Sequence, residues 1–249
     1  MSIRKSIGSV VLCCAILATA SPRPAGAEEF IPEQRREIES VIHDYLLRHP
    51  DVLLEALRAA EEKLKSEAGD QAKHALVARR SEIFDDPETP VGGNPKGDVT
   101  LVEFFDYRCP YCKQVQPKLQ ELLAGDRELR IAYKEFPILG PVSVTAARAA
   151  LAAQRQGKYE TFHNAMMAAP GQVTEDTVYR VAKTVGLDVD RLKQDMAAPQ
   201  IEAALKANQT LADALDIHGT PGFVIGDQIV PGAIELASLK ELVAGARSK

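Results

Sequence analysis

The sequence predicts an α/β domain that contains an inserted block of helices and follows an N-terminal helical arm. Apolar and β-branched runs at 99–106 and 129–136, and again near the C-terminus, are typical of buried strands. The stretch between them, residues 142–215, is rich in alanine and leucine and contains no convincing strand. Few aromatics (5% of the chain) and 45% hydrophobic residues also favour helices over an all-β core.

Residues 1–27 are predicted to be a cleaved signal peptide. Arg4 and Lys5 precede an uncharged, mostly apolar run at 7–20, and small residues at 25–27 provide a cleavage site. The run is shorter than the roughly 20 apolar residues that span a bilayer, although an uncleaved N-terminal anchor is the alternative. We therefore expect a secreted protein located in the periplasm.

Charge and cysteine content narrow the function of the mature chain. Removal of residues 1–27 leaves 27 basic and 35 acidic residues, a net charge of −8, so we expect no nucleic-acid partner. Only Cys109 and Cys112 remain of the four cysteines. One close pair in an exported protein of this size indicates chemically active thiols rather than a disulfide-stapled fold.

Residues 28–84 form the predicted arm. Apolar residues such as Ile38, Val41 and Tyr45 recur at helical spacing, and a narrow stripe that includes Leu54 and Leu57 continues after a break at His49-Pro50. The stripe belongs either to a self-association stalk, in which several copies bury one another's apolar side chains, or to a helix packed on its own domain.

A Pro- and Gly-rich linker at 85–97 is predicted to lead into a domain at 98–249, with the helical insertion at about 138–205. Strands are expected at 99–106, 129–136, 223–225 and 228–230. Helices are expected at 110–124, 142–156, 158–168, 174–185, 188–197, 199–215 and 236–246.

Cys109-Pro110-Tyr111-Cys112 lies where a buried strand leads into a helix. Unpaired N–H groups and the helix dipole at that end favour a thiolate, the attacking species in disulfide exchange. Pro110 suits the first helical position, which places Cys109 outward and shelters Cys112. We therefore assign Cys109 as nucleophile and Cys112 as resolving thiol.

Metal binding and a structural disulfide are the alternative uses of the pair. A zinc site lacks a second ligand pair, because the five histidines are scattered, whereas two thiolates suffice for Cu(I). A structural disulfide would close a very small loop and stabilise little. We expect no cofactor and no metal, with a copper-handling or chaperone-like binding protein as the alternative function.

The motifs Phe-Phe-Asp-Tyr-Arg-Cys-Pro-Tyr-Cys and Gly-Thr-Pro-Gly-Phe resemble those of the thioredoxin superfamily. The helical block between them is similar to its DsbA-type branch. The arm, with Asp-Tyr-Leu-Leu-Arg-His-Pro-Asp at 44–51, resembles the N-terminal region of the ScsC/Com1-like proteins, the suppressor-of-copper-sensitivity group. The resemblance covers nearly all of residues 30–246 and implies a thioredoxin fold.

The resemblance also implies roles for single residues. Pro221 matches a cis-proline beside the active-site sulfurs, and Thr220 before it matches a residue that tunes partner choice, so both are expected to bind substrate together with Pro110 and Tyr111. Glu103 matches a semi-buried acid that assists proton transfer to the resolving cysteine; a solvated strand residue is the alternative. Pro117 matches a kink proline in the first helix.

Tyr111 departs from the DsbA pattern, which has histidine at that position. The Cys-Pro-Tyr-Cys string is shared with glutaredoxins, which reduce rather than oxidise. The signal peptide and helical insertion still favour an exported oxidoreductase that forms or isomerises disulfides. Its expected partners are cysteine-containing exported clients and a membrane redox partner, and the resemblance implies a homo-oligomer, a trimer in the related group.

Overall fold

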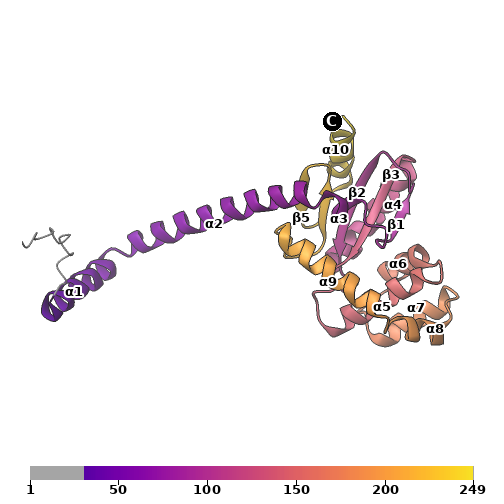
Figure 1. Cartoon of the computed structure of the whole chain (residues 1–249), viewed down its shortest axis with the longest axis horizontal. Coiled ribbons are helices and arrows are strands. Elements are labelled where there is room, and N and C mark those ends of the chain that lie inside the picture. Colours follow the sequence, from indigo (N-terminus) through magenta and orange to yellow (C-terminus); the bar gives the residue numbers. More distant parts are fainter. Residues whose placement is uncertain (1–30, 249) are drawn as a thin grey trace, which may run out of the picture. The chain divides into compact units, whose positions relative to one another are not determined.

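The computed structural model describes residues 31–248 (Figure 1). The chain divides into two units, one ending at Ala60 and the other running from Glu61 onward, and each is described by itself. The predicted signal peptide at 1–27 lies outside the described residues. No described helix is both long enough and apolar enough to cross a membrane.

The first unit contains α1 (Pro32–Arg48) and the beginning of α2 (Pro50–Ala78). A proline occupies the first turn of each helix, where its missing N–H costs no hydrogen bond. Helix α1 has no buried residue, and its apolar residues Val41, Ile42 and Leu47 are more than half exposed. This unit therefore has helical structure without a core of its own, as predicted for the arm.

The second unit contains the rest of α2 and all the remaining elements. Its further helices are α3 (Arg80–Phe84), α4 (Pro110–Gly125), α5 (Pro141–Gln154), α6 (Tyr159–Ala168), α7 (Glu175–Thr184), α8 (Val189–Asp195), α9 (Pro199–Ala214) and α10 (Leu236–Arg247). Its strands are β1 (Val91–Gly93), β2 (Val99–Phe105), β3 (Leu129–Glu135), β4 (Gly222–Ile225) and β5 (Gln228–Pro231). The predicted helices and strands of the domain are present within a few residues of their expected ends.

The five strands form one mixed sheet in the order β1-β3-β2-β4-β5. Strands β2 and β3 are parallel, and the other neighbours are antiparallel. Helices α4 and α10 contact each other and cover one face, whereas α3 and α9 pack on the other (Figure 1). A sheet covered by helices on both faces is the thioredoxin-like arrangement that the sequence predicted.

Alternation along β2 assigns its side chains to these two layers. Leu101 and Phe105 belong to the core under α4, α10 and the helical block α5–α8. Val102 and Phe104 belong to a smaller core, which also contains Leu76 at the end of α2 and Leu211 of α9. The central strand is therefore buried on both sides.

The structure corrects two boundaries. The linker predicted at 85–97 contains strand β1, which pairs antiparallel with β3. Gly93 has a left-handed φ of 73°, and a Cβ there would lie 2.6 Å from the carbonyl oxygen of Leu129, so the local glycines permit the close approach. In addition, Ile83 and Phe84, at the end of the predicted arm, are buried in the core of the second unit.

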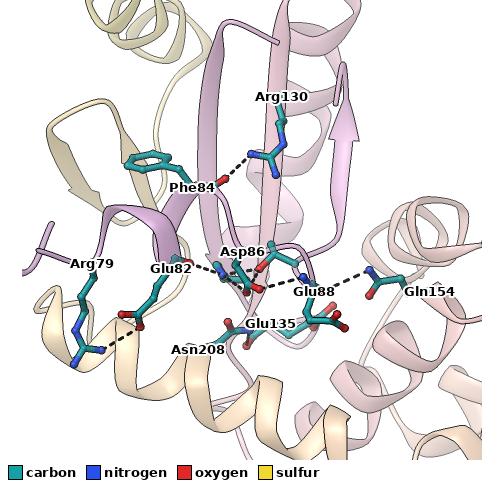
Figure 2. A network of polar contacts seen from close by, with 11 residues as sticks. Arg79, Glu82, Phe84, Asp86, Glu88, Arg130, Glu135, Gln154 and Asn208 are labelled. Carbon is teal, nitrogen blue, oxygen red and sulfur yellow. Dashed lines mark hydrogen bonds and ion pairs between the residues drawn. The ribbon is translucent and has the colours of Figure 1, made fainter. Parts of the chain in front are cut away.

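Buried polar contacts hold the chain before β1 against the sheet (Figure 2). Lys134 of β3 is 1% exposed, and its Nζ donates to the carbonyl of Glu82, to Asp86 and to Thr89. Arg130, also on β3, donates to the carbonyl of Phe84. Strand β3 thus holds the end of the predicted arm and the segment that was predicted to be a linker.

Candidate active site

The two cysteines begin helix α4 directly after the central strand. Cys109 is the N-cap residue, Pro110 occupies the first turn, and Cys112 lies on the buried side of that turn. The prediction that Pro110 occupies the first helical position is confirmed. Pro117 lies inside the same helix, as expected for a kink proline.

The cis-proline loop lies against the first cysteine. The Thr220–Pro221 peptide bond is cis, and the Cys109 Sγ is 3.1 Å from the carbonyl oxygen of Thr220, although the two residues are 111 positions apart. The prediction of a cis bond beside Cys109 is confirmed. The carbonyl of Pro221 accepts a hydrogen bond from the Gly232 N–H at 2.8 Å, which ties this loop to the end of β5.

The two thiols have opposite acidities. A hydrogen bond from the Cys112 thiol, together with those from the Thr220 side chain and the N–H groups of the first turn, lowers the pKa of Cys109 to about 5 despite partial burial. Burial raises the pKa of Cys112 far above the ordinary value, and the hydrogen bond to Cys109 adds to this. At neutral pH Cys109 is a thiolate and Cys112 a thiol.

Exposure distinguishes the cysteines less than expected. Cys109 is 4% exposed and Cys112 is not exposed at all, so the outward placement predicted for Cys109 is wrong in degree. The Thr220 carbonyl covers the first sulfur. The difference between the thiols therefore lies in their ionisation, which the mutual hydrogen bond and the N–H groups of the helix terminus favour at Cys109 and which burial opposes at Cys112.

Glu103 lies on β2 under these thiols and is fully buried. The reading of Glu103 as a solvated strand residue is wrong. Neither carboxylate oxygen has a hydrogen-bond partner among the described residues. Burial, with a smaller contribution from Cys109, raises the pKa of Glu103 to about 8. The group is thus able to gain or lose a proton near neutral pH.

The sequence analysis missed Asp106, which shapes the loop before Cys109. Its buried carboxylate accepts hydrogen bonds from the N–H of Arg108 at 2.8 Å, the N–H of Leu139 at 3.0 Å and the hydroxyl of Ser143 at 2.8 Å. These contacts join the active-site loop to the start of α5. The Asp in the Phe-Phe-Asp-Tyr-Arg-Cys string was a usable signal, because a carboxylate at the end of a buried strand needs donors nearby.

A second buried polar cluster was also missed. Glu135 at the end of β3 accepts hydrogen bonds from the hydroxyls of Tyr107 at 3.0 Å and Tyr159 at 2.8 Å, and the Tyr107 oxygen lies 3.1 Å from His163. Burial lowers the pKa of His163 to about 3, so this imidazole is neutral. The residues of this cluster come from a loop, strand β3 and helix α6, and no local sequence pattern connects them.

Tyr111 is 60% exposed on the first turn of α4, so it is placed to contact a second molecule. Among the described residues, no group of three or more histidine, cysteine or acidic side chains gathers in a way that would hold a metal ion. The arrangement combines a low-pKa thiolate, a protonated partner thiol and a buried acid. Such a set is suited to disulfide exchange with internal resolution.

Comparison with known proteins agrees with this geometry. The family model of the DSBA-like thioredoxin domain matches residues 100–244, and that of the copper resistance protein ScsC N-terminal domain matches residues 34–67. A thioredoxin-like oxidoreductase from Silicibacter pomeroyi DSS-3 is 49% identical, with a TM-score of 0.67, over 68% of this chain and 98% of that one. Proteus mirabilis ScsC in a transitional conformation is 26% identical, with a TM-score of 0.65, over 88% of this chain and 99% of that one.

The curated relatives are longer proteins. The chain is 29% identical over 180 residues to the Na(+)/H(+) antiporter NhaA 3 of Salinispora tropica, a match that covers 69% of this chain and only 28% of the antiporter. The chain thus spans about a quarter of the length of these relatives. Because the DSBA-like model matches more than half of the chain, the protein belongs to the DSBA-like thioredoxin domain family.

Proposed function

We propose that the protein catalyses thiol–disulfide exchange, forming or isomerising disulfides in exported client proteins through Cys109 and Cys112. The observation that carries this proposal is the opposite acidity of two thiols on one helical turn, beside a cis-proline. The thiolate is the nucleophile in exchange, and the neutral thiol is held ready to resolve the product.

Disulfide formation starts from the oxidised pair. A client thiolate attacks the Cys109 sulfur, the Cys109–Cys112 bond breaks, and Cys112 leaves as a thiolate that takes up a proton. A second client thiolate attacks the client sulfur of the mixed disulfide and releases Cys109 as a thiolate. The client loses two electrons and the pair gains them, and a membrane redox partner then reoxidises the pair.

Isomerisation starts from the reduced pair. The Cys109 thiolate attacks a client disulfide, forms a mixed disulfide and releases one client thiolate. Another client thiolate then attacks the mixed disulfide and restores Cys109, so that no net electrons are transferred. The low pKa of Cys109 favours both routes, because the same thiolate is a ready nucleophile and a good leaving group.

Glu103 is the proposed proton carrier for Cys112. The burial that raises the pKa of Cys112 means that this thiol needs a base before it can attack or an acid when it leaves. The negative charge of Glu103 raises the pKa of Cys112 further, which shows that the two groups interact. The pKa of Glu103 itself, about 8, suits proton transfer near neutral pH. The client is proposed to bind along the backbone of Thr220 and Pro221 and against Pro110 and Tyr111.

The arm is proposed to associate with copies of itself into a trimer. Its exposed apolar residues Val41, Leu54 and Leu57 have no core to bury them, and the ScsC N-terminal model matches this region. Changing Val41 and Leu57 to serine should yield monomers in light scattering. Serine at Val77, an α2 residue that is 77% exposed, is the matched control and should leave the oligomer intact. A wild-type monomer would contradict this part of the proposal.

Export to the periplasm is proposed from the pattern of residues 1–27. Mass spectrometry of the protein purified from the periplasm should give a chain that begins at Glu28. A chain that retains residues 1–27 would indicate an anchored protein instead.

Replacement of Cys112 by serine tests the exchange function against the copper-binding alternative. An exchange enzyme without its resolving thiol should accumulate mixed disulfides between Cys109 and client proteins, visible on non-reducing gels and absent from the Cys109→Ser variant. A copper-binding protein should form no such adducts and should lose its affinity for Cu(I) in both variants.

A further inference from the structure

A cavity of about 410 Å³ lies beside the reactive cysteine. It is lined by the segment that leads into α4, by the loop before α5 and by the loop after α6; its lining includes Arg108, Pro110, Lys113, Leu139, Gln172 and Val173. Pro110 directly follows Cys109. A side chain that enters this cavity therefore belongs to a segment that passes the active-site sulfur.

The cavity carries two cations and no lining carboxylate. Neither Arg108 nor Lys113 forms an ion pair with any of the described residues. Both lie in a chain with a formal net charge of −5. Two unpaired cations on one cavity wall in an acidic protein form a local field that favours an anion.

The hydrogen bonds of these cations leave donors free. The Arg108 guanidinium donates one bond to the carbonyl of Leu139, and its Nε is buried with no partner among the described residues. Lys113 Nζ donates to the carbonyl of Ala169 at 2.7 Å and lies 3.5 Å from that of Met166. Carbonyl contacts position both groups without neutralising their charge, and a guanidinium with free donors matches a carboxylate.

Extended peptides rise about 3.3 Å per residue, so a cavity next to Pro110 receives a side chain within two or three positions of the cysteine held at Cys109. Tyr111, Ile138 and Leu139 are exposed in the same region and offer apolar contact to the rest of the segment. The cavity can thus contact one client side chain close to the exchanging cysteine.

We propose that the cavity lined by Arg108 and Lys113 is a specificity site that selects clients with an aspartate or glutamate within three residues of the exchanging cysteine. The inference rests on the proposed function, since it names the class of client that the exchange site prefers. The client carboxylate accepts hydrogen bonds from the free donors of both cations, which holds the neighbouring sulfur in line with Cys109.

The test uses the full chain with Cys112 changed to serine and with Cys109 carrying a neutral 2-thiopyridyl group in disulfide linkage. A peptide thiolate attacks the Cys109 sulfur, the peptide–Cys109 disulfide forms, and 2-thiopyridone leaves and is followed by absorbance. The peptides contain one cysteine and place glutamate, glutamine or lysine at each of the three positions on either side. Each rate is divided by the rate of the same peptide with free dithiodipyridine, which removes the effect of the neighbour on the peptide thiol itself.

At one or more positions the glutamate peptide should react about tenfold faster than the glutamine peptide, and lysine should be slowest. The ratio should approach one in about 1 M salt, where charges are screened within roughly 3 Å. The salt series needs no further variant, so it does not depend on whether altered proteins fold.

Changing Arg108 and Lys113 to glutamine should remove the preference for glutamate. Lys240→Gln, at an exposed position of α10, also removes one positive charge; it is the control and should keep the preference. A glutamate-to-glutamine ratio of one at every position overturns the specificity site and leaves the exchange function standing. Peptides that react with the protein no faster than with the free disulfide overturn the exchange function and the specificity site together.

Discussion

Glu103 and Lys134 are buried charged side chains on neighbouring strands with very different surroundings. In the parallel register, Glu103 of β2 lies beside Tyr133 of β3, and Lys134 lies beside Phe104. Because successive side chains of a strand point to opposite faces, Glu103 lies on the face covered by α4 and Lys134 on the face covered by α3 and α9. The same sheet therefore buries one charge on each side.

The lysine is fully satisfied and the glutamate is not. The three partners of Lys134 Nζ lie at 2.6–3.0 Å and match the three donors of an ammonium group. They join the segment before β1 to the sheet (Figure 2). Both oxygens of Glu103 lack any partner among the described residues. An unsatisfied buried acid costs stability, and its place beside two thiols supports the proposed role of Glu103 in proton transfer.

The pKa directions express the same difference. Burial lowers the pKa of Lys134, while Asp86 opposes that effect and keeps the cation paired. Burial raises the pKa of Glu103 to about 8 with no donor to oppose it. The α3/α9 face therefore uses its charge for structure, and we propose that the α4 face uses its charge for proton transfer. The predictions that follow separate these two uses.

The largest expected effect is on stability, from Lys134→Ala. Loss of the ammonium removes one donor each from Asp86, Thr89 and the carbonyl of Glu82, and alanine leaves a gap where the buried lysine stem lay, a change that costs about 2–5 kcal/mol. Urea unfolding of the reduced protein should show this loss. Cys109 should keep its alkylation pH profile, because the lysine lies on the other face of the sheet. Lys134→Met, which retains most of the volume, separates lost packing from lost charge.

An equal stability loss in Glu103→Gln would contradict the comparison, since it would give the unpartnered acid the same structural role as the paired lysine.

The next effect is on rate, from Glu103→Gln. An amide has nearly the same shape but cannot exchange a proton, so resolution of the mixed disulfide by Cys112 should slow about 10- to 100-fold near pH 7. Formation of the mixed disulfide, which uses the Cys109 thiolate, should change much less. Stopped-flow measurement of the two phases with a model disulfide checks this. If both phases slow equally, Glu103 acts on Cys109 rather than on the proton of Cys112.

The sequence predicted those parts of the site that local patterns encode. A buried strand followed by Cys109-Pro110-Tyr111-Cys112 predicted the strand-to-helix transition, which depends on neighbouring residues only. The cis bond at Pro221 and its place beside Cys109 followed from the resemblance to a known family.

The parts that the sequence did not predict depend on residues far apart in the chain. A lysine in a strand is usually exposed, and nothing near Lys134 indicates that Asp86 lies beside it, 48 positions away. Strand β1 was missed because its glycines are typical of a turn. The cavity lined by Arg108 and Lys113 is also lined by Val173, which lies in the loop after α6 and is about 60 positions away, so no local pattern predicts it.

The last prediction concerns the pH dependence of stability, to which Glu103 and Cys109 contribute with opposite signs. Between its ordinary pKa of 4.5 and about 8, folded Glu103 holds a proton that the unfolded chain has lost, so stability falls as pH rises. Between about 5 and its ordinary value of 9.0, folded Cys109 has lost a proton that the unfolded chain keeps, so stability rises with pH. Each group alone gives a limiting slope of about 1.4 kcal/mol per pH unit, and in the reduced wild type the two largely cancel between pH 5 and 8.

Single substitutions should therefore reveal slopes of opposite sign. Reduced Cys109→Ser keeps only the Glu103 contribution and should lose stability from pH 5 to 8 relative to wild type. Reduced Glu103→Gln keeps only the Cys109 contribution and should gain stability over the same range, because the amide does not titrate. Urea unfolding at closely spaced pH values measures both, and other titrating groups cancel in the differences. If Glu103→Gln follows the wild type across this pH range, with no gain in stability, Glu103 is already ionised in the fold and the proton-carrier role fails.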